Sequence, residues 1–166
     1  MTPVTVEEML AARDRRAGRQ RAFLAKYQVP LVYLTFNIPG PDKLPRNLEA
    51  ALPLACRQVE AALREHGWPV SGAWSETART GCEACWAVDG PAAPIKAAMT
   101  AIEEGAPFGR LLDLDVLDAS GKKLSRELPR RCLLCRRPAQ LCARSRAHSV
   151  EQLLEAIGTI LEEALS

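Results

Sequence analysis

The spacing of hydrophobic residues along this chain distinguishes the segments predicted to be helices from those predicted to be strands. Between residues 46 and 66 hydrophobic residues recur near every 3.6 positions, which is typical of an amphipathic helix. Residues 31–36 form a short continuous apolar run with the composition and length of a strand. Ser149 and Gln152 match a capping box, and the apolar stripe after them predicts a final helix. The pattern therefore predicts an α+β protein.

The remaining segments complete a recognisable order of elements. A second capping box, Thr5 with Glu8, predicts a first helix that ends near Lys26. We expect strands at 70–78, 85–88 and 109–117, a possible returning edge at 122–125, and a helix at 94–104. The β-α-β-β-α-β order matches a ferredoxin-like split βαβ arrangement. We predict a single domain over 1–166, with an N-terminal helix in 1–28, a Cys/Arg-rich loop at 129–148 and a C-terminal helix in 149–166.

The predicted strand at 109–117 carries the first candidate chemistry. Alternate residues of a strand share a face, so Leu112, Leu114 and Val116 should lie on one side. The other side should carry Leu111, Asp113 and Asp115. Two convergent carboxylates suit Mg²⁺, which shares oxygen ligands with substrate phosphates. The alternative is an exposed strand face without a metal. Arg110 would add a cation beside the pair, whereas we assign Asp118 to the following turn.

Cysteines supply a second candidate site. Cys132, Cys135, Cys142 and His148 could hold a structural zinc ion with three thiolates and an imidazole. The alternative is buried free thiols with a histidine at the surface. For Cys82 and Cys85 we expect burial in the core rather than a redox role.

Charge is distributed unevenly along the chain, although the formal net charge is only +2. The arginines that crowd the first helix are expected to form a solvated face. Residues 130–148, in contrast, contain no acidic residue and carry Arg130, Arg131, Arg136, Arg137, Arg144 and Arg146. This run predicts an anion site for a triphosphate, an acidic protein or RNA.

Other features of the sequence narrow the class of partner. Aromatic residues make up 5% of the chain, which counts against single-stranded RNA, so we expect no nucleic-acid partner. No apolar stretch approaches the length of a membrane span, and no secretory signal is visible at Met1–Thr5. We therefore expect a cytoplasmic protein with reduced cysteines and no membrane partner.

Taken together, several motifs resemble those of a known family, the apo-citrate lyase phosphoribosyl-dephospho-CoA transferases. They occur in the family's order from residue 12 to residue 148. The motifs are Ala12-Arg13-Asp14 with Arg19-Gln20, Pro30-Leu31-Val32 leading to Pro39-Gly40-Pro41, Gly109-Arg110-Leu111-Leu112-Asp113-Leu114-Asp115-Val116, Leu124-Ser125-Arg126, Pro129-Arg130-Arg131-Cys132-Leu133-Leu134-Cys135, and Cys142-Ala143-Arg144 with His148.

The resemblance implies a reaction and roles for these residues. A serine of the apo acyl carrier subunit of citrate lyase attacks the α-phosphorus of triphosphoribosyl-dephospho-CoA, and pyrophosphate leaves. Asp113, Asp115 and Arg110 would be catalytic, with Mg²⁺ on the two aspartates. The substrate-binding residues would be Arg13, Arg126, Arg130, Arg131, Arg144 and Arg146.

The chain departs from the family pattern in places. Ala106-Pro107-Phe108-Gly109 lacks the histidine that often precedes this motif, so no general base is assigned there. The link from Arg126 to Pro129 is shorter than usual, and Gly81-Cys82-Glu83 replaces a Gly-Pro-Glu. Two alternatives stay open: a nucleotidyltransferase for another carrier, such as that of malonate decarboxylase, and a zinc-stabilised module that binds RNA or protein without catalysis.

Overall fold

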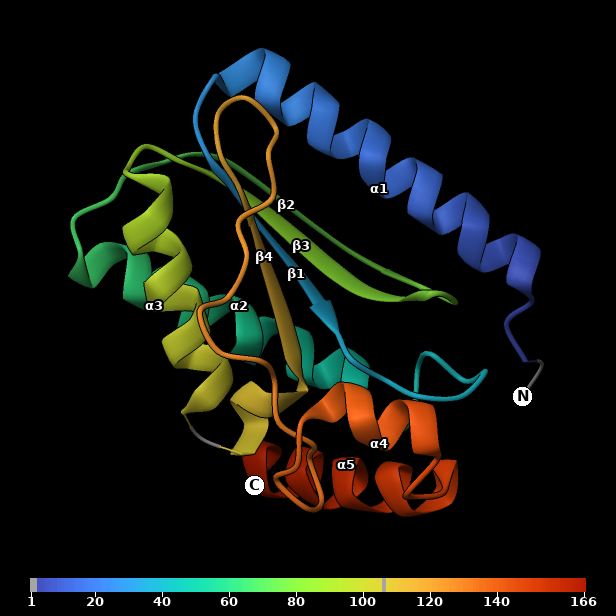
Figure 1. Cartoon of the computed structure of the whole chain (residues 1–166). Coiled ribbons are helices and arrows are strands. Elements are labelled where there is room, and N and C mark those ends of the chain that lie inside the picture. The colour runs from blue at the N-terminus through green and yellow to red at the C-terminus, as the bar shows by residue number, and fades with distance from the viewer. Residues whose placement is uncertain (1–2, 106) are drawn as a thin grey trace.

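The computed structural model describes residues 3–105 and 107–166, which form one four-stranded sheet with helices against both faces (Figure 1). The element order confirms the predicted α+β class and the β-α-β-β-α-β succession. The elements are α1 (Val6–Tyr27), β1 (Leu31–Phe36), α2 (Leu48–Glu65), β2 (Val70–Ala78), β3 (Gly81–Val88), α3 (Ala92–Glu104), the 3₁₀ helix η1 (Pro107–Leu111), β4 (Leu112–Leu117), α4 (Ala139–Ser145) and α5 (Val150–Leu165).

The sheet has the strand order β2-β3-β1-β4, and every neighbouring pair is antiparallel. β4 is therefore an edge strand, and β1 lies between β3 and β4. In the register, Thr35 of β1 lies opposite Glu83 of β3 on one side and Asp113 of β4 on the other. Directly opposed residues point to the same face, so these three side chains form one row across the sheet.

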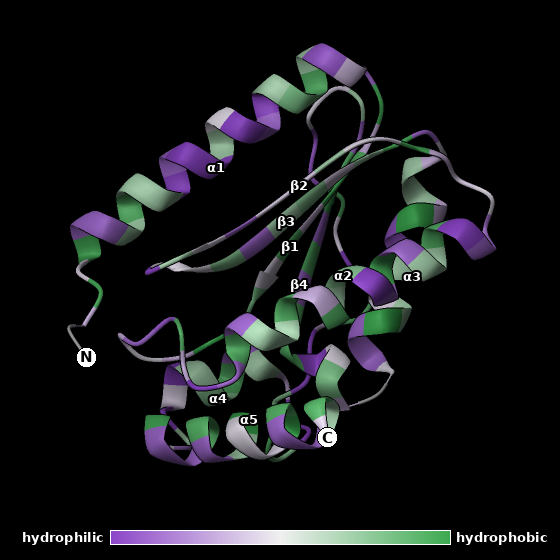
Figure 2. Cartoon of the chain, turned by 180° about the vertical axis from the view of Figure 1, so that it is seen from behind, coloured by the Kyte–Doolittle hydropathy of each residue, from purple (hydrophilic) through white to green (hydrophobic). Residues whose placement is uncertain are grey.

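The two faces of the sheet are covered unequally. One face packs against α2, α3 and α5 to form the main core, where Leu34, Trp86 and Leu114 are almost fully buried. The other face carries a smaller cluster around Leu31, Tyr33 and Cys85, which packs against the C-terminal half of α1. α2 and α3 both contribute buried apolar residues to the main core, and Figure 2 shows the two helices on the side of the sheet opposite α1. Cys82 and Cys85 are buried, as the sequence predicted.

The predicted strand at 109–117 is wrong in its first three residues, which belong to η1. The cause is a close approach at Gly109, where an added Cβ would collide with the carbonyl oxygen of Ile102. The tight turn from α3 into β4 rotates Leu111 into the main core, so Leu111 does not share a face with the aspartates. β4 itself begins at Leu112.

Smaller differences concern the helix ends and the segment after β4. Ser149 and Gln152 form both bonds of the predicted capping box, whereas at the first helix the Thr5 hydroxyl accepts from the Glu8 amide. The expected returning edge at 122–125 is reduced to one bridge between Leu117 and Lys123. The short helix α4 was not predicted. Within the described residues, no helix combines the length and the apolar character needed to cross a membrane.

Candidate active site

Asp113 and Asp115 lie side by side on the face of β4 that is turned toward α1, as the alternation predicted. The Asp113 side chain is 49% exposed and that of Asp115 is 26% exposed. Each carboxylate has a cation near it: Lys123 Nζ lies 3.1 Å from Asp115, and Arg130 lies 3.8 Å from Asp113. The pair is thus accessible and partly charge-compensated, with oxygen ligands of the type that Mg²⁺ prefers.

The backbone between the two aspartates is held by buried charged residues of α3. Lys96 Nζ donates to the carbonyl oxygen of Leu114 over 3.1 Å, and Glu103 Oε2 accepts from the Leu114 amide over 2.8 Å. Both residues are at least 92% buried. Burial raises the pKa of Glu103, and this effect outweighs the lowering by the Leu114 amide and by the neighbouring cations. Because β4 is an edge strand, these side chains take the hydrogen-bonding place of a fifth strand.

The two hydrogen bonds to Leu114 predict that Lys96 and Glu103 position the aspartates without touching substrate. Replacing Lys96 with methionine should lower transfer by roughly 10- to 100-fold and raise the Mg²⁺ concentration needed for half-maximal rate, because outer-shell partners orient metal ligands. Glu103→Gln should act in the same direction. Initial rates in a Mg²⁺ titration would measure both effects.

Glu104→Gln is the matched control, because Glu104 is exposed and pairs only with Arg126 among the contacts of this region. A loss of thermal stability with an unchanged Mg²⁺ dependence would restrict Lys96 and Glu103 to a purely structural role.

Three predicted arginines organise the loop beside β4. Arg110 donates to the carbonyl oxygens of Cys132, over 2.7 Å, and Leu133. Arg130 donates to the carbonyls of Arg110 and Leu112 and lies 3.5 Å from Glu103. Arg126 pairs with Glu103 at 3.5 Å and with Glu104 at 2.8 Å. These contacts tie the segment 126–133 to the start of β4.

The other predicted arginines are exposed. Arg131 donates to the carbonyl oxygen of Arg136, over 3.0 Å, while Arg144 lies on α4 and Arg146 directly follows it. Arg13 lies on the exposed side of α1.

A groove of about 1900 Å³ lies between η1, the segment 126–139, α4 and α5. Its lining includes five of the predicted catalytic and substrate-binding arginines, Arg110, Arg126, Arg130, Arg131 and Arg146, together with Cys132, Cys142 and His148 of the cysteine motif. Arg130 connects this groove to Asp113, so the cationic lining and the acidic pair belong to one continuous region.

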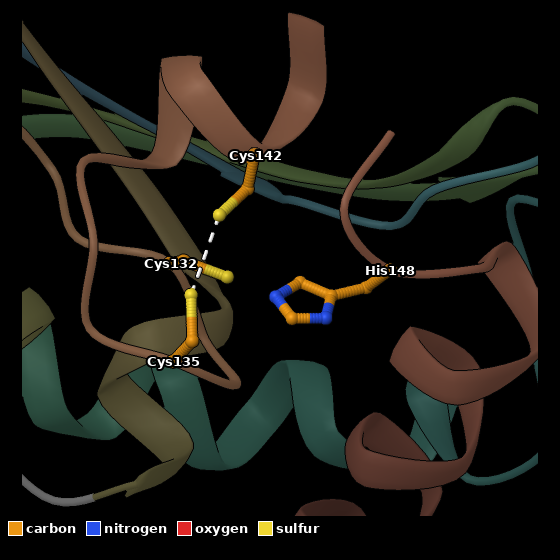
Figure 3. Close-up of side chains that lie close together, drawn as sticks. All are labelled: Cys132, Cys135, Cys142 and His148. Atoms are coloured by element: carbon orange, nitrogen blue, oxygen red, sulfur yellow. Dashed lines mark hydrogen bonds between the residues drawn. The ribbon is translucent and has the colours of Figure 1, made fainter. Parts of the chain in front are cut away.

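The cysteine motif forms a compact cluster at one side of the groove. The ligand atoms of Cys132, Cys135, Cys142 and His148 all lie within 4.8 Å of one another. Figure 3 shows the imidazole ring turned toward the three sulfur atoms, with the Cys135 and Cys142 sulfurs 3.3 Å apart. In the described part of the chain, no other group of three or more histidine, cysteine and acidic side chains is so arranged. The four residues can therefore hold a metal ion.

Two local features fit a metal at this cluster. His148 Nε2 is buried and has no hydrogen-bond partner, so its lone pair or proton is left without compensation. A hydrogen bond with the neighbouring His148 ring, and to a smaller extent one with the Arg137 amide, lowers the pKa of Cys135 to about 6. The hydrogen bond with Cys135 raises the pKa of Cys142 to about 11. Three sulfurs and one imidazole nitrogen are a common tetrahedral donor set for zinc.

The structure also contains a polar network that the sequence interpretation missed. Arg16 Nε donates to Glu83 Oε1 over 2.8 Å, and the Tyr33 hydroxyl donates to the same oxygen over 2.7 Å. Arg19 donates in turn to the Tyr33 hydroxyl over 2.9 Å and stacks on Trp74. The expected solvated face is therefore wrong for Arg16 and Arg19. A signal was available, since both share a helix face with the apolar Phe23.

An acidic pair beside a groove lined by guanidinium groups is an arrangement suited to an enzyme that transfers phosphate-linked groups. A model of the apo-citrate lyase phosphoribosyl-dephospho-CoA transferase family matches residues 4–164. A probable transferase of this name from Vibrio cholerae is 39% identical over an alignment of 159 residues, and the alignment covers 93% of this chain and 89% of that protein. An Escherichia coli transferase of this name is 34% identical over an alignment of 164 residues, and the alignment covers 96% of this chain and 90% of that protein.

The chain therefore belongs to the apo-citrate lyase phosphoribosyl-dephospho-CoA transferase family, as its motifs suggested. The predicted enzyme class and activity, attachment of the prosthetic group to the acyl carrier subunit of citrate lyase, are thereby confirmed. One departure from the family pattern, Ala106, lies outside the described residues.

Proposed function

We propose that the enzyme transfers the 2′-(5″-phosphoribosyl)-3′-dephospho-CoA group from its triphosphoribosyl precursor to a serine of the apo acyl carrier subunit of citrate lyase. The serine oxygen bonds to the α-phosphorus while the bond from that phosphorus to the bridging oxygen breaks. The electron pair of the broken bond stays on pyrophosphate, and the serine proton is released. The observation that carries this proposal is the 3.8 Å contact of Asp113 with Arg130, a residue that lines the large arginine-rich groove.

Asp113 and Asp115 are the proposed Mg²⁺ ligands. Their shared face on β4, their accessibility and the anchoring of Leu114 support this role. When bound, Mg²⁺ would neutralise negative charge on the transferring phosphoryl group and on pyrophosphate. We place Arg110 beside this site as a residue that holds η1 against the Cys132 loop.

The groove is the proposed site of the dephospho-CoA part of the donor. Arg126, Arg130, Arg131 and Arg146 line it, while Arg144 and Arg13 are exposed at the surface, where the carrier would approach. Among these residues, Arg126 and Arg130 already bind Glu103, so the exposed arginines have the most donors available for a phosphate.

This difference predicts unequal effects of arginine replacement. Arg131→Ala and Arg146→Ala should each weaken donor binding by about tenfold or more, and each should reduce the salt dependence of binding, because a charge-assisted contact is lost. Calorimetric titration of the donor across a salt series would measure both effects. Arg15→Ala on the exposed side of α1 is the control.

If both groove variants bind the donor with unchanged affinity and unchanged salt dependence, these two arginines face the solvent and do not contact the donor.

A structural zinc ion is the proposed ligand of Cys132, Cys135, Cys142 and His148. Few apolar residues in 130–148 are buried, so the segment has little core of its own. The cluster would hold the loop that carries Arg130 and Arg131, and the unpartnered Nε2 of His148 supports its presence.

The direct test of the function is transfer to purified apo carrier subunits. Mass spectrometry of the citrate lyase carrier should show the added phosphoribosyl-dephospho-CoA mass and the release of pyrophosphate. The carrier of malonate decarboxylase serves as the second substrate. Preferential modification of that carrier would overturn the assignment of the partner, and no modification of either carrier would favour a binding module.

We also propose a ferredoxin-like fold in one domain and a cytoplasmic location. The β-α-β-β-α-β order with antiparallel neighbours in the order β2-β3-β1-β4 supports the fold. Six free cysteines are consistent with a reducing compartment.

A further inference from the structure

A second, smaller cavity of about 180 Å³ lies between α1, the end of β1 and the turn that joins β2 to β3. Arg16 and Lys43 contribute positive charge to its walls, and Thr35 and Asn37 contribute neutral polar groups. The cavity is too small for an adenosine or a pantetheine chain, for which the large groove offers roughly ten times the volume. It therefore fits a compact polar group.

This cavity adjoins the aspartate pair. Thr35, in its wall, lies directly opposite Asp113 in the antiparallel register, and opposed Cα atoms are about 4.5–5.5 Å apart. Asn37 lines both the small cavity and the large groove. On its other side, Asp113 is 3.8 Å from Arg130 of the groove. Asp113 is therefore adjacent to a wall residue of each cavity, Thr35 of the small one and Arg130 of the groove.

The cations of the small cavity have hydrogen-bond donors to spare. The ion pair of Arg16 with Glu83 uses Nε, and a guanidinium group has five N–H donors. Lys43 Nζ donates to the carbonyl oxygen of Ile38 over 2.7 Å, which leaves two of its three protons. The carboxylate in the wall, Glu83, accepts at one oxygen from Arg16 and from the Tyr33 hydroxyl. The charges of Arg16 and Glu83 offset each other, so Lys43 supplies the net positive charge of the residues that line the cavity.

The partial burial of the Lys43 ammonium group also favours the binding of an anion beside it. Desolvation by burial lowers the pKa of this lysine. No carboxylate lies within ion-pair distance of it among the described residues. A bound anion would restore the lost solvation of the ammonium group.

We propose that the small cavity binds the terminal diphosphate of the triphosphoribosyl donor, with Arg16 and Lys43 as its cationic contacts. This inference rests on the proposed function. The donor then extends from the groove past Asp113, so that its α-phosphorus lies at the aspartates and its leaving group lies in the cavity. As the bond to the α-phosphorus breaks, Arg16 and Lys43 stabilise the charge that develops on pyrophosphate.

Inorganic pyrophosphate with Mg²⁺ is the probe, and its binding is measured by calorimetry on the full chain. Lys43→Met and Arg16→Met should each weaken pyrophosphate binding by about tenfold or more, and Arg16→Lys should recover part of the loss. The matched controls are Lys26→Met and Arg15→Met, on the exposed part of α1, which should bind pyrophosphate like the wild type. Dephospho-CoA, which carries an internal diphosphate and no triphosphate, is titrated in parallel and should bind all variants equally.

A footprint on the wild type guards against variants that fold poorly. Acetylation of Lys43, followed by mass spectrometry, should slow when pyrophosphate is added, while that of Lys26 should not change.

Unprotected Lys43, or unchanged pyrophosphate affinity in folded Lys43→Met and Arg16→Met, overturns the inference. So does a loss that appears only for dephospho-CoA, which would place the internal diphosphate in the cavity. These outcomes are distinct from a failure of the proposed function, which would appear as absent transfer by the wild type whatever binds in the cavity.

Discussion

Replacing either aspartate of β4 with asparagine is expected to reduce transfer to the carrier by about 100-fold or more. Asparagine preserves the shape of Asp113 and Asp115 but removes the negative charge that would hold Mg²⁺, and losing one such electrostatic interaction has effects of this order. The fold should survive, because both side chains are partly exposed and neither lies in a core cluster. Single-turnover rates with saturating donor would measure the chemical step, and thermal unfolding would check the fold.

Asp118→Asn is the matched control for these variants. Asp118 follows the same strand, but its carboxylate accepts bonds from Ser120 and the Lys122 amide and shapes the turn, as the sequence indicated. Its replacement should leave the rate near that of the wild type. A folded Asp113→Asn or Asp115→Asn variant with near-native transfer would remove these residues from the catalytic site.

Removal of metal from the cysteine cluster is expected to have the second large effect. Protein purified without a histidine tag should contain about one zinc ion per chain by elemental analysis. Cys132→Ser should lose this zinc, accelerate amide exchange across residues 130–148 and abolish most transfer. The expected size is large because zinc binding to such sets in small peptides is worth roughly 10–16 kcal/mol of apparent folding energy at neutral pH.

Cys56→Ser provides the control, since Cys56 lies on α2, which does not contribute to the cluster. It should retain both zinc and activity. A zinc content near zero, together with three freely titrating thiols in 130–148 and full activity, would contradict the zinc proposal. The transferase assignment would still stand in that case, because the family membership rests on the sequence comparisons over almost the whole chain.

Alternation and helical periodicity were sufficient to predict most of the fold, because both follow from the geometry of one element at a time. The bounds of β2 and the shared face of Asp113 and Asp115 are as predicted. The 3₁₀ turn at η1 was missed because it depends on Gly109 meeting the carbonyl of Ile102, a contact between elements. The short helix α4 was missed because its seven residues expose most of their side chains and leave little apolar pattern.

In the candidate site, too, the features that depend on local sequence were predicted and those that depend on distant partners were not. The spacing of Cys132, Cys135, Cys142 and His148 was enough to predict the cluster, since ligand spacing is local information. Glu103, Lys96 and Glu83 were not predicted, because each functions through a partner far along the chain. A buried acid at the end of the apolar helix α3 was the available signal for Glu103.

The covering of β4 by Lys96 and Glu103 has a consequence for how this enzyme behaves in solution. An uncovered edge strand offers its free amides and carbonyls to a strand of another molecule, and chains that meet in this way polymerise. Here Leu114, at the middle of the exposed edge, already has both backbone groups bonded to α3 side chains. Arg130 and Leu124 take further groups of the same edge at Leu112 and Val116. The contacts that hold the aspartates in place therefore also keep β4 from serving as a template for aggregation.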